Sequence, residues 1–308
     1  MGLGARFARL PRPLSRGLLP ALRYLNLMRS LELRLLAPFV RHVEGWSILD
    51  VGCGHGLYSM DLARRGATLT GCDLQRPALS DAHRTAQGLG LNGRSLFLVA
   101  EASALPLPTR KFDLVVCNCV LEHVADDKGC LEAMVRSLQP GGILTLTVDR
   151  AGHGLVLGFL ERLPAAAKRR LLRPQVAAAT TVSSGLDARL DDLYFVLRRY
   201  HGDELEKELS ALGMTVIASR RYLSGVGAAQ YEAFHALRGL DPNGKMGRLL
   251  YALSSLLLYP LAVWSDDRQD VRGYGLAIVA RKGPEFGSSV GSGDEPMIDL
   301  CSGKANGG

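Results

Sequence analysis

The chain has 308 residues and a mass of 33.2 kDa, which suits one large domain or one domain with additions. Hydrophobic residues make up 47% and charged residues 22%, near the globular average, so a wholly disordered chain is excluded. The six cysteines form no C-x-x-C pair. This pattern favours reduced thiols in a cytoplasmic protein over a disulfide framework, and we expect no metal site.

The positive charge is concentrated near the N-terminus. Residues 1–42 hold eight arginines and a single acidic residue, Glu32, whereas the other 266 residues carry 29 basic and 29 acidic side chains. We interpret residues 1–45 as a basic arm with an amphipathic helix around 18–41. That helix would dock on the folded body or make peripheral contact with an anionic membrane. A mitochondrial transit peptide has a similar composition and stays open as an alternative.

Between residues 46 and 149, short apolar runs alternate with stretches of helical periodicity. The expected strands are 47–51, 67–73, 95–99, 112–117 and 142–148, the last following a turn at 139–142. The expected helices are 57–65, 77–89 and 128–138. This rhythm indicates βαβ units, and therefore a parallel sheet with helices on both faces.

The pattern changes after residue 149. Helices are expected at 155–173, 186–200 and 203–212, and strands at 214–219 and 274–280. The fold class is therefore α/β: a Rossmann-like, doubly wound, mostly parallel seven-stranded sheet with helical insertions after strands 5 and 6. We assign one domain to 46–282, with a core at 46–149 and insertions at 150–200 and 220–272. Residues 283–308 are rich in Gly and Ser, and we expect a disordered tail.

One segment of the second insertion is unusually apolar. Leu249–Trp264 contains 16 consecutive uncharged residues, whereas a bilayer-spanning helix needs about 20. Pro260 and two serines weaken a membrane-spanning interpretation further. A buried helix or lid over an apolar pocket and an interfacial helix are the two interpretations that we keep.

The strongest local signal is a glycine-rich loop after the first strand. The loop contains Gly52, Gly54 and Gly56, with Asp50 just before it and Asp73 at the end of the next strand. Glycines let a ligand approach the backbone, the following helix offers unpaired N–H groups, and an acidic residue there can bind ribose hydroxyls. The G-x-G-x-x-G fingerprint of nicotinamide enzymes fails, because Leu57 stands at the third glycine position.

Further motifs follow in a characteristic order. They are Ala100–Pro108, Lys111–Val116, Val120–Val124 with the triplet Leu-Glu-His, and Leu138–Gly142. Together with Ile48–Gly56, this order resembles the type 11 family of class I S-adenosylmethionine-dependent methyltransferases. The resemblance covers about residues 46–149, and more weakly the stretches 200–215 and 273–282. It implies S-adenosylmethionine as the cofactor.

The resemblance also implies roles for individual residues. Asp50 would bind the amino group of the cofactor, and Asp73 its ribose hydroxyls. Leu74 and Glu101 would lie at the adenine, although Glu101 stands where the family usually has Asp, and Ala102 would also bind the cofactor. The loop around the amino-acid part would be shaped by Gly52, Gly54 and Gly56.

Two residues after the fourth expected strand complete the candidate site. Asn118 would line the cofactor site through its backbone. His123 has a neutral imidazole that can take a proton at pH 7, so it is the candidate catalytic base. A scaffold role for His123 in the cofactor shell is the alternative, because the same triplet recurs in family members with different chemistry.

The acceptor is expected to be a small molecule. The Pro-Pro motif of nucleobase amine methyltransferases and the Pro-Cys pair of cytosine-carbon methyltransferases are missing, which argues against nucleic acid. The apolar insertions favour a hydrophobic or lipid-like acceptor. A methyltransferase of a polar sugar or natural product, and a non-catalytic subunit with the same fold, remain as alternatives.

Overall fold

The computed structural model describes residues 27–106, 109–149, 198–231, 245–267 and 273–284. Most of the expected basic arm, the helix at 155–173, nearly all of that at 186–200, and all of the tail beyond residue 284 lie outside the described residues. Of the expected helix at 186–200, residues 198–200 are described and are not helical.

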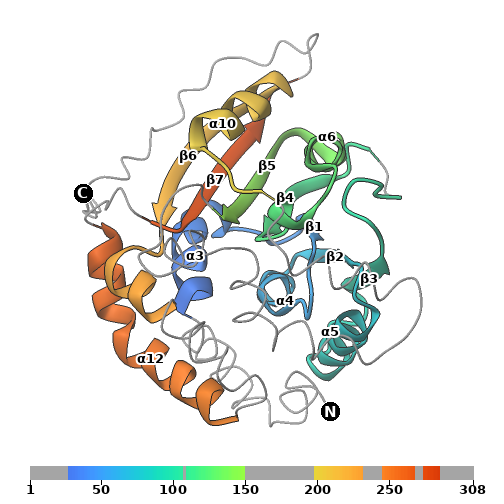
Figure 1. Cartoon of the computed structure of the whole chain (residues 1–308). Helices are drawn as coiled ribbons and strands as arrows, with labels where there is room; N and C mark the ends of the chain where they lie inside the picture. Colours follow the sequence, from blue (N-terminus) through green and yellow to red (C-terminus); the bar gives the residue numbers. More distant parts are fainter. Residues whose placement is uncertain (1–26, 107–108, 150–197, 232–244, 268–272, 285–308) are drawn as a thin grey trace, which may run out of the picture.

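A seven-stranded sheet forms the centre of the molecule, in the order β3-β2-β1-β4-β5-β7-β6 (Figure 1). The strands are β1 Ser47–Val51, β2 Thr68–Asp73, β3 Ser95–Val99, β4 Phe112–Asn118, β5 Leu138–Asp149, β6 Met214–Tyr222 and β7 Gly275–Lys282. The pairs among β1 to β5 are parallel, and β7 runs antiparallel to both β5 and β6. The expected mostly parallel, Rossmann-like sheet is therefore confirmed.

Helices cover both faces of the sheet. Among the described residues, the helices include α3 Leu27–Leu36, η1 Ala37–Val40, α4 Leu57–Arg64, α5 Arg76–Gly88, η2 Leu121–His123, α6 Asp127–Ser137, α10 Gly202–Ala211 and α12 Lys245–Asp267. Side chains of α4 and α5 form one hydrophobic core with one face of the sheet. Side chains of α6 and α10 form a second core with the other face. Two cores of this kind hold the strand ends in fixed positions.

A third hydrophobic cluster joins segments that lie far apart in the sequence. It contains Leu27 and Leu31 of α3, Tyr222 at the end of β6, and Ala262 of α12. The backbone N–H of Leu27 also donates to Ser255 Oγ over 3.3 Å. Figure 1 shows the result, with α12 lying beside α3 at the edge of the molecule.

Three element boundaries differ from expectation. The turn expected at 139–142 lies inside β5, where Phe112 pairs with Leu138 but Leu114 pairs with Ile143, so the extra residues form an irregularity in the strand. In the described part of the expected helix 18–41, the α-helix ends at Leu36, because Pro38 starts a short 3-10 turn. Helix α12 extends beyond the uncharged run at both ends and contains Pro260.

Within the described part of the chain, no helix combines the length and the apolar character needed to span a bilayer.

The pairing of Tyr222 with Gly275 generates a first prediction. A Cβ atom at Gly275 would lie 2.2 Å from Tyr222 Cζ, so Gly275→Ala must displace a ring that is 2% exposed. We expect a loss of about 1–3 kcal/mol in the free energy of unfolding, measured with urea. Gly202→Ala is the control, since its nearest atom would be 3.7 Å away. Equal losses in the two variants would contradict this packing.

Candidate functional site

The site lies at the topological switch point, where the strand order of the sheet reverses. From β1 the chain proceeds outward to β2 and β3, and it then returns to β4 on the other side of β1. Loops at the carboxyl ends of β1 and β4 therefore diverge and leave a crevice, the usual ligand position in open α/β sheets. A cavity of about 360 Å³ opens there, and among its lining residues are Asp50, Gly52, Gly54, Gly56 and Asn118.

The loop after β1 owes its shape to glycine. Gly52 has a φ of +68°, and a Cβ atom there would lie 2.3 Å from Val120 Cγ2. Gly56 also has a positive φ and precedes the first residue of α4. The Gly52 N–H donates to Cys72 O over 2.8 Å, and the Gly54 N–H donates to Asp73 Oδ2 over 2.8 Å. The loop is thus tied to the end of β2.

Asp50 provides a buried carboxylate beneath this loop. It is 5% exposed, and its Oδ2 accepts a 2.5 Å hydrogen bond from Ser59 Oγ in α4. Burial raises the pKa of Asp50 to about 7, while Ser59 and the positive charge of Arg29 act in the opposite direction. Burial disfavours the ionised carboxylate. A cationic ligand that pairs with it would offset this cost, so such a ligand would be favoured at this position.

Arg29 is the main cavity residue that sequence reasoning missed. It comes from α3 and lines the same cavity as Asp50, with its side chain one third exposed. From the sequence, Arg29 is only one of the eight arginines in residues 1–42. The available signal was its spacing from Glu32, since an i,i+3 ion pair forms between them at 2.5 Å. Arg34 is also paired, with Asp267, so the charge left in the arm is smaller than expected.

The other expected cofactor residues, Asp73 included, are not among the described residues that line the cavity. Asp73 is half-buried, and its Oδ1 accepts from the Gln75 N–H over 2.8 Å. Leu74 and Ala102 are half-buried and Glu101 is exposed, and none of the three is among the described residues that line the cavity.

His123 lies at the end of η2, just after β4. It is half-buried. Burial raises the pKa of Asp149 at the end of β5, while Arg199 and, to a smaller extent, His123 act in the opposite direction. Glu122 next to it is 1% exposed, and burial followed by the charge of Asp149 raises its pKa to about 8. His123 is not among the described residues that line the cavity, so the structure places it on the same sheet edge but not in the cavity itself.

This arrangement has a definite chemical capacity. A buried carboxylate and a guanidinium in one cavity can hold the ammonium and carboxylate of an amino acid. Asp73 lies at the adjacent strand end, where it can accept hydrogen bonds from ribose hydroxyls. An adenosyl amino acid combines these three groups.

Comparison with known proteins agrees with this capacity. Residues 49–146 match the family described as "Methyltransferase domain". The ubiquinone biosynthesis O-methyltransferase of Pseudomonas entomophila is 33% identical over 158 residues, which are 48% of this chain and 67% of that protein. The enzyme of the same name from Pseudomonas fluorescens is 32% identical over 156 residues, with the same coverage.

Solved structures share the fold at low identity. The [4+2]-cyclase SpnF is 20% identical, with a TM-score of 0.53 over 82% of this chain and 80% of that one. Phosphoethanolamine N-methyltransferase 2 of Haemonchus contortus, solved with S-adenosyl-L-methionine, is 16% identical, with a TM-score of 0.53 over 92% of this chain and 61% of that one. A cyclase and a methyltransferase on one fold show that the fold alone does not define the reaction.

The chain belongs to the methyltransferase family, within the class I S-adenosylmethionine-dependent methyltransferases. It is an enzyme that transfers a methyl group, and S-adenosylmethionine is its cofactor. The cavity fits this cofactor, because the Asp50 carboxylate and the Arg29 guanidinium suit the ammonium and carboxylate of its methionine part.

Burial of Asp50 generates a second prediction. Because its folded pKa of about 7 exceeds the ordinary 3.8, the folded protein loses stability as pH rises from about 4 to 7. The Asn side chain of Asp50→Asn does not titrate, so this variant lacks that loss. Its free energy of unfolding should therefore rise relative to that of the wild type by about 3 kcal/mol from pH 5 to pH 8. Asp61→Asn is the control, since this cavity carboxylate is 25% exposed and pairs with Arg65. A difference that does not change with pH would contradict the burial effect.

Proposed function

We propose that the enzyme methylates a hydroxyl oxygen of a hydrophobic, lipid-like acceptor. The observation that carries this proposal is the apolar surface of α12. Six large side chains of this helix are between 47% and 75% exposed, namely Leu250, Leu253, Leu256, Leu257, Leu261 and Trp264. Helix α12 packs against α3, which contributes Arg29 to the cofactor cavity. The names of the curated relatives, ubiquinone biosynthesis O-methyltransferases, support both the lipid-like class and the oxygen acceptor.

The chain's own residues would hold and orient the cofactor. In this proposal Asp50 binds its ammonium group, Arg29 its carboxylate and Asp73 its ribose hydroxyls. Loop backbone at Gly52, Gly54 and Gly56 surrounds the amino-acid part. Asn118 closes the cavity at the end of β4, and Leu74, Glu101 and Ala102 surround the adenine. When bound, S-adenosylmethionine supplies an activated methyl group on a sulfonium, and alignment with exclusion of water then provides most of the catalysis.

Methylation of a hydroxyl oxygen releases its proton, which a base must accept. We assign it to the imidazole of His123, which lies after β4 on the same edge of the sheet as the cavity. The electrostatic coupling between His123 and Asp149 supports this role, because a nearby carboxylate stabilises the imidazolium that forms.

The same helix would bring the enzyme to an anionic membrane surface. Asp266 accepts from the N–H groups of Leu223 and Ser224, and Asp267 pairs with Arg34, so both acids of α12 are engaged with the body. Residues 1–26 carry five arginines and no acid, and they join the body where Leu27 contacts α12. Their positive charge favours anionic lipid as the partner.

A labelling experiment tests the acceptor class. We expect methyl-labelled S-adenosylmethionine and the purified enzyme to label the organic phase of a lipid extract, because an apolar acceptor partitions there. Mass spectrometry of the labelled species should show a gain of one methyl group, and His123→Ala should reduce the rate. Label that appears in the aqueous metabolite fraction instead would contradict a lipid-like acceptor and favour a polar sugar or natural product.

Vesicle flotation tests the membrane contact. We expect the wild type to float with anionic vesicles at low salt and to be released at 1 M salt, where the Debye length is about 3 Å. Leu257→Gln combined with Leu261→Gln should weaken flotation about tenfold or more, because two Leu side chains no longer enter the interface. Leu96→Gln, at a 55% exposed position on β3, is the matched control.

Two results would contradict this contact. One is equal flotation of the wild type and the α12 variant. The other is a stable dimer in the absence of vesicles that the α12 variant dissociates, since the apolar face would then belong to a second copy.

A further inference from the structure

Glu32 is a fully buried acidic side chain on α3 that the proposed reaction does not use. It is 0% exposed, and an isolated carboxylate in such a position would be strongly destabilising. Three donors surround it. Arg29 Nη1 donates to Oε2 over 2.5 Å, Tyr222 OH donates to Oε1 over 2.5 Å, and Cys119 Sγ donates to Oε1 over 3.1 Å.

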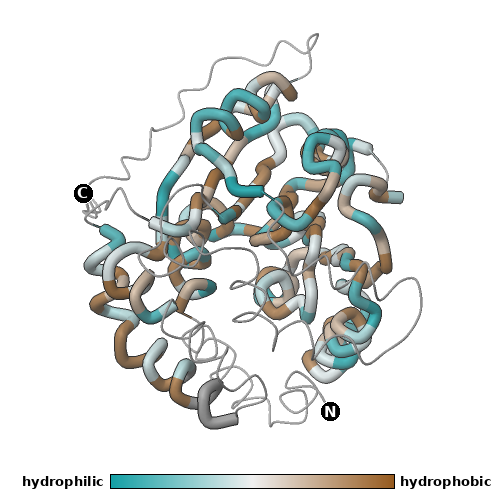
Figure 2. The backbone as a smooth tube through the Cα atoms, viewed as in Figure 1, coloured by the Kyte–Doolittle hydropathy of each residue, from teal (hydrophilic) through white to brown (hydrophobic). Residues whose placement is uncertain are grey.

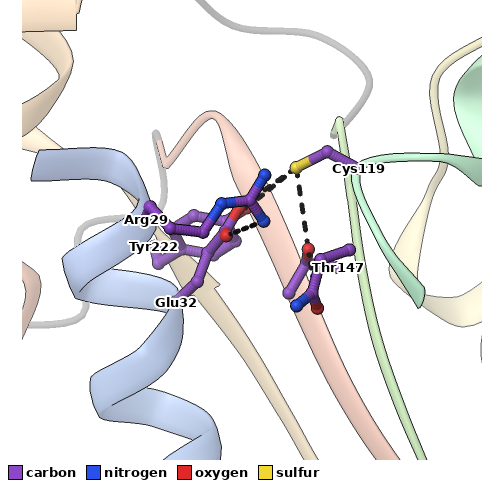
Figure 3. Close-up of polar contacts among 6 residues, drawn as sticks. Arg29, Glu32, Cys119, Thr147 and Tyr222 are labelled. Carbon is purple, nitrogen blue, oxygen red and sulfur yellow. Dashed lines mark hydrogen bonds and ion pairs between the residues drawn. The ribbon is translucent and has the colours of Figure 1, made fainter. Parts of the chain in front are cut away.

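These contacts connect three separate elements, as Figure 3 shows. Arg29 and Glu32 come from α3, Tyr222 from the end of β6, and Cys119 from the residue after β4. Cys119 has a φ of +53°, an uncommon conformation for a residue with a side chain, and its N–H donates to Thr147 O over 2.8 Å. Backbone at the end of β4 is therefore held in a strained conformation that brings the thiol to Glu32.

The network also begins and ends at the cofactor cavity. Arg29 lines the cavity at one end. At the other end, Thr147 Oγ1 contacts Cys119 Sγ at 3.6 Å and Asn118 Oδ1 at 3.4 Å, and Asn118 lines the cavity as well. Glu32 thus determines where the Arg29 guanidinium lies relative to Asn118 and Asp50.

We propose that Glu32 is a positioning residue that directs Arg29 toward the carboxylate of S-adenosylmethionine. An Arg side chain has many rotamers, and a bidentate partner needs a defined orientation of its planar guanidinium. Glu32 fixes that orientation from the buried side, while Tyr222 and Cys119 fix Glu32. This inference rests on the proposed contact between Arg29 and the cofactor carboxylate.

A purely structural role for Glu32 makes a different prediction. In that case Glu32 would only dock α3 on the body, and its loss would weaken binding of every ligand of the cavity equally. The ion pair of Arg34 with Asp267 docks the same helix from outside the cavity at 2.8 Å. Arg34→Gln therefore serves as the matched control for helix docking.

The test compares two ligands by calorimetry on the full chain, S-adenosylmethionine and its decarboxylated analogue. We expect the wild type to prefer S-adenosylmethionine by about 10- to 100-fold, because the analogue lacks the group that Arg29 would bind. Arg29→Met should reduce this preference to near unity. Glu32→Gln should reduce it several-fold, and the double variant should show no further reduction than Arg29→Met. Arg34→Gln should keep the wild-type preference.

Each other outcome has a distinct meaning. If Arg29→Met keeps the preference, the proposed contact of Arg29 with the cofactor is wrong. If Arg29→Met loses it but Glu32→Gln keeps it, or weakens both ligands equally, the positioning role is wrong. Tyr222→Phe provides a milder variant should Glu32→Gln unfold. It removes one donor to Glu32 and should cause a smaller loss of preference, and an unchanged preference in that variant would also overturn the proposal.

Discussion

The absence of a side chain at Gly52 is the constraint on which the site depends. The loop after β1 turns back through a left-handed conformation and passes so close to Val120 that no Cβ atom fits. This close approach brings the segment after β4 against the loop after β1. The diverging ends of β1 and β4 supply the crevice, and the glycine loop leaves room in it for a ligand.

Two opposite charges then give the cavity its polarity. Asp50 lies at the end of β1, where burial holds its carboxyl group partly protonated near neutral pH. Arg29 enters from α3 on the other side and carries a charge that favours the ionised form of Asp50. A ligand that carries both an ammonium and a carboxylate would therefore meet a group of opposite charge for each, Asp50 for the ammonium and Arg29 for the carboxylate. Electrostatic matching of this kind favours a zwitterion over a simple anion or cation.

The sequence was sufficient for the parts of the fold and site that depend on local pattern. Alternating apolar runs predicted all seven strands, and the spaced glycines predicted the loop, because both signals lie within a few neighbouring residues. Arg29 was missed since its place in the cavity depends on how α3 packs against Tyr222 and α12. The irregular start of β5 was missed for a similar reason. Gln139 to Gly142 have the composition of a turn, yet strand pairing on either side includes them in the sheet.

The sequence match to the family covers some elements of the cavity but not others. The matched family segment ends at residue 146, so it contains the loop, Asp50 and Asp73 but not α3, β6 or α12. Yet α3 supplies Arg29 to the cavity, and it also packs against β6, β7 and α12. In the proposed function, a change at α12 would therefore reach the cofactor contact of Arg29 through α3, without any substitution in the glycine loop. The Tyr222–Glu32 hydrogen bond connects α3 to β6, so the proposed acceptor surface and the proposed cofactor contact share one helix.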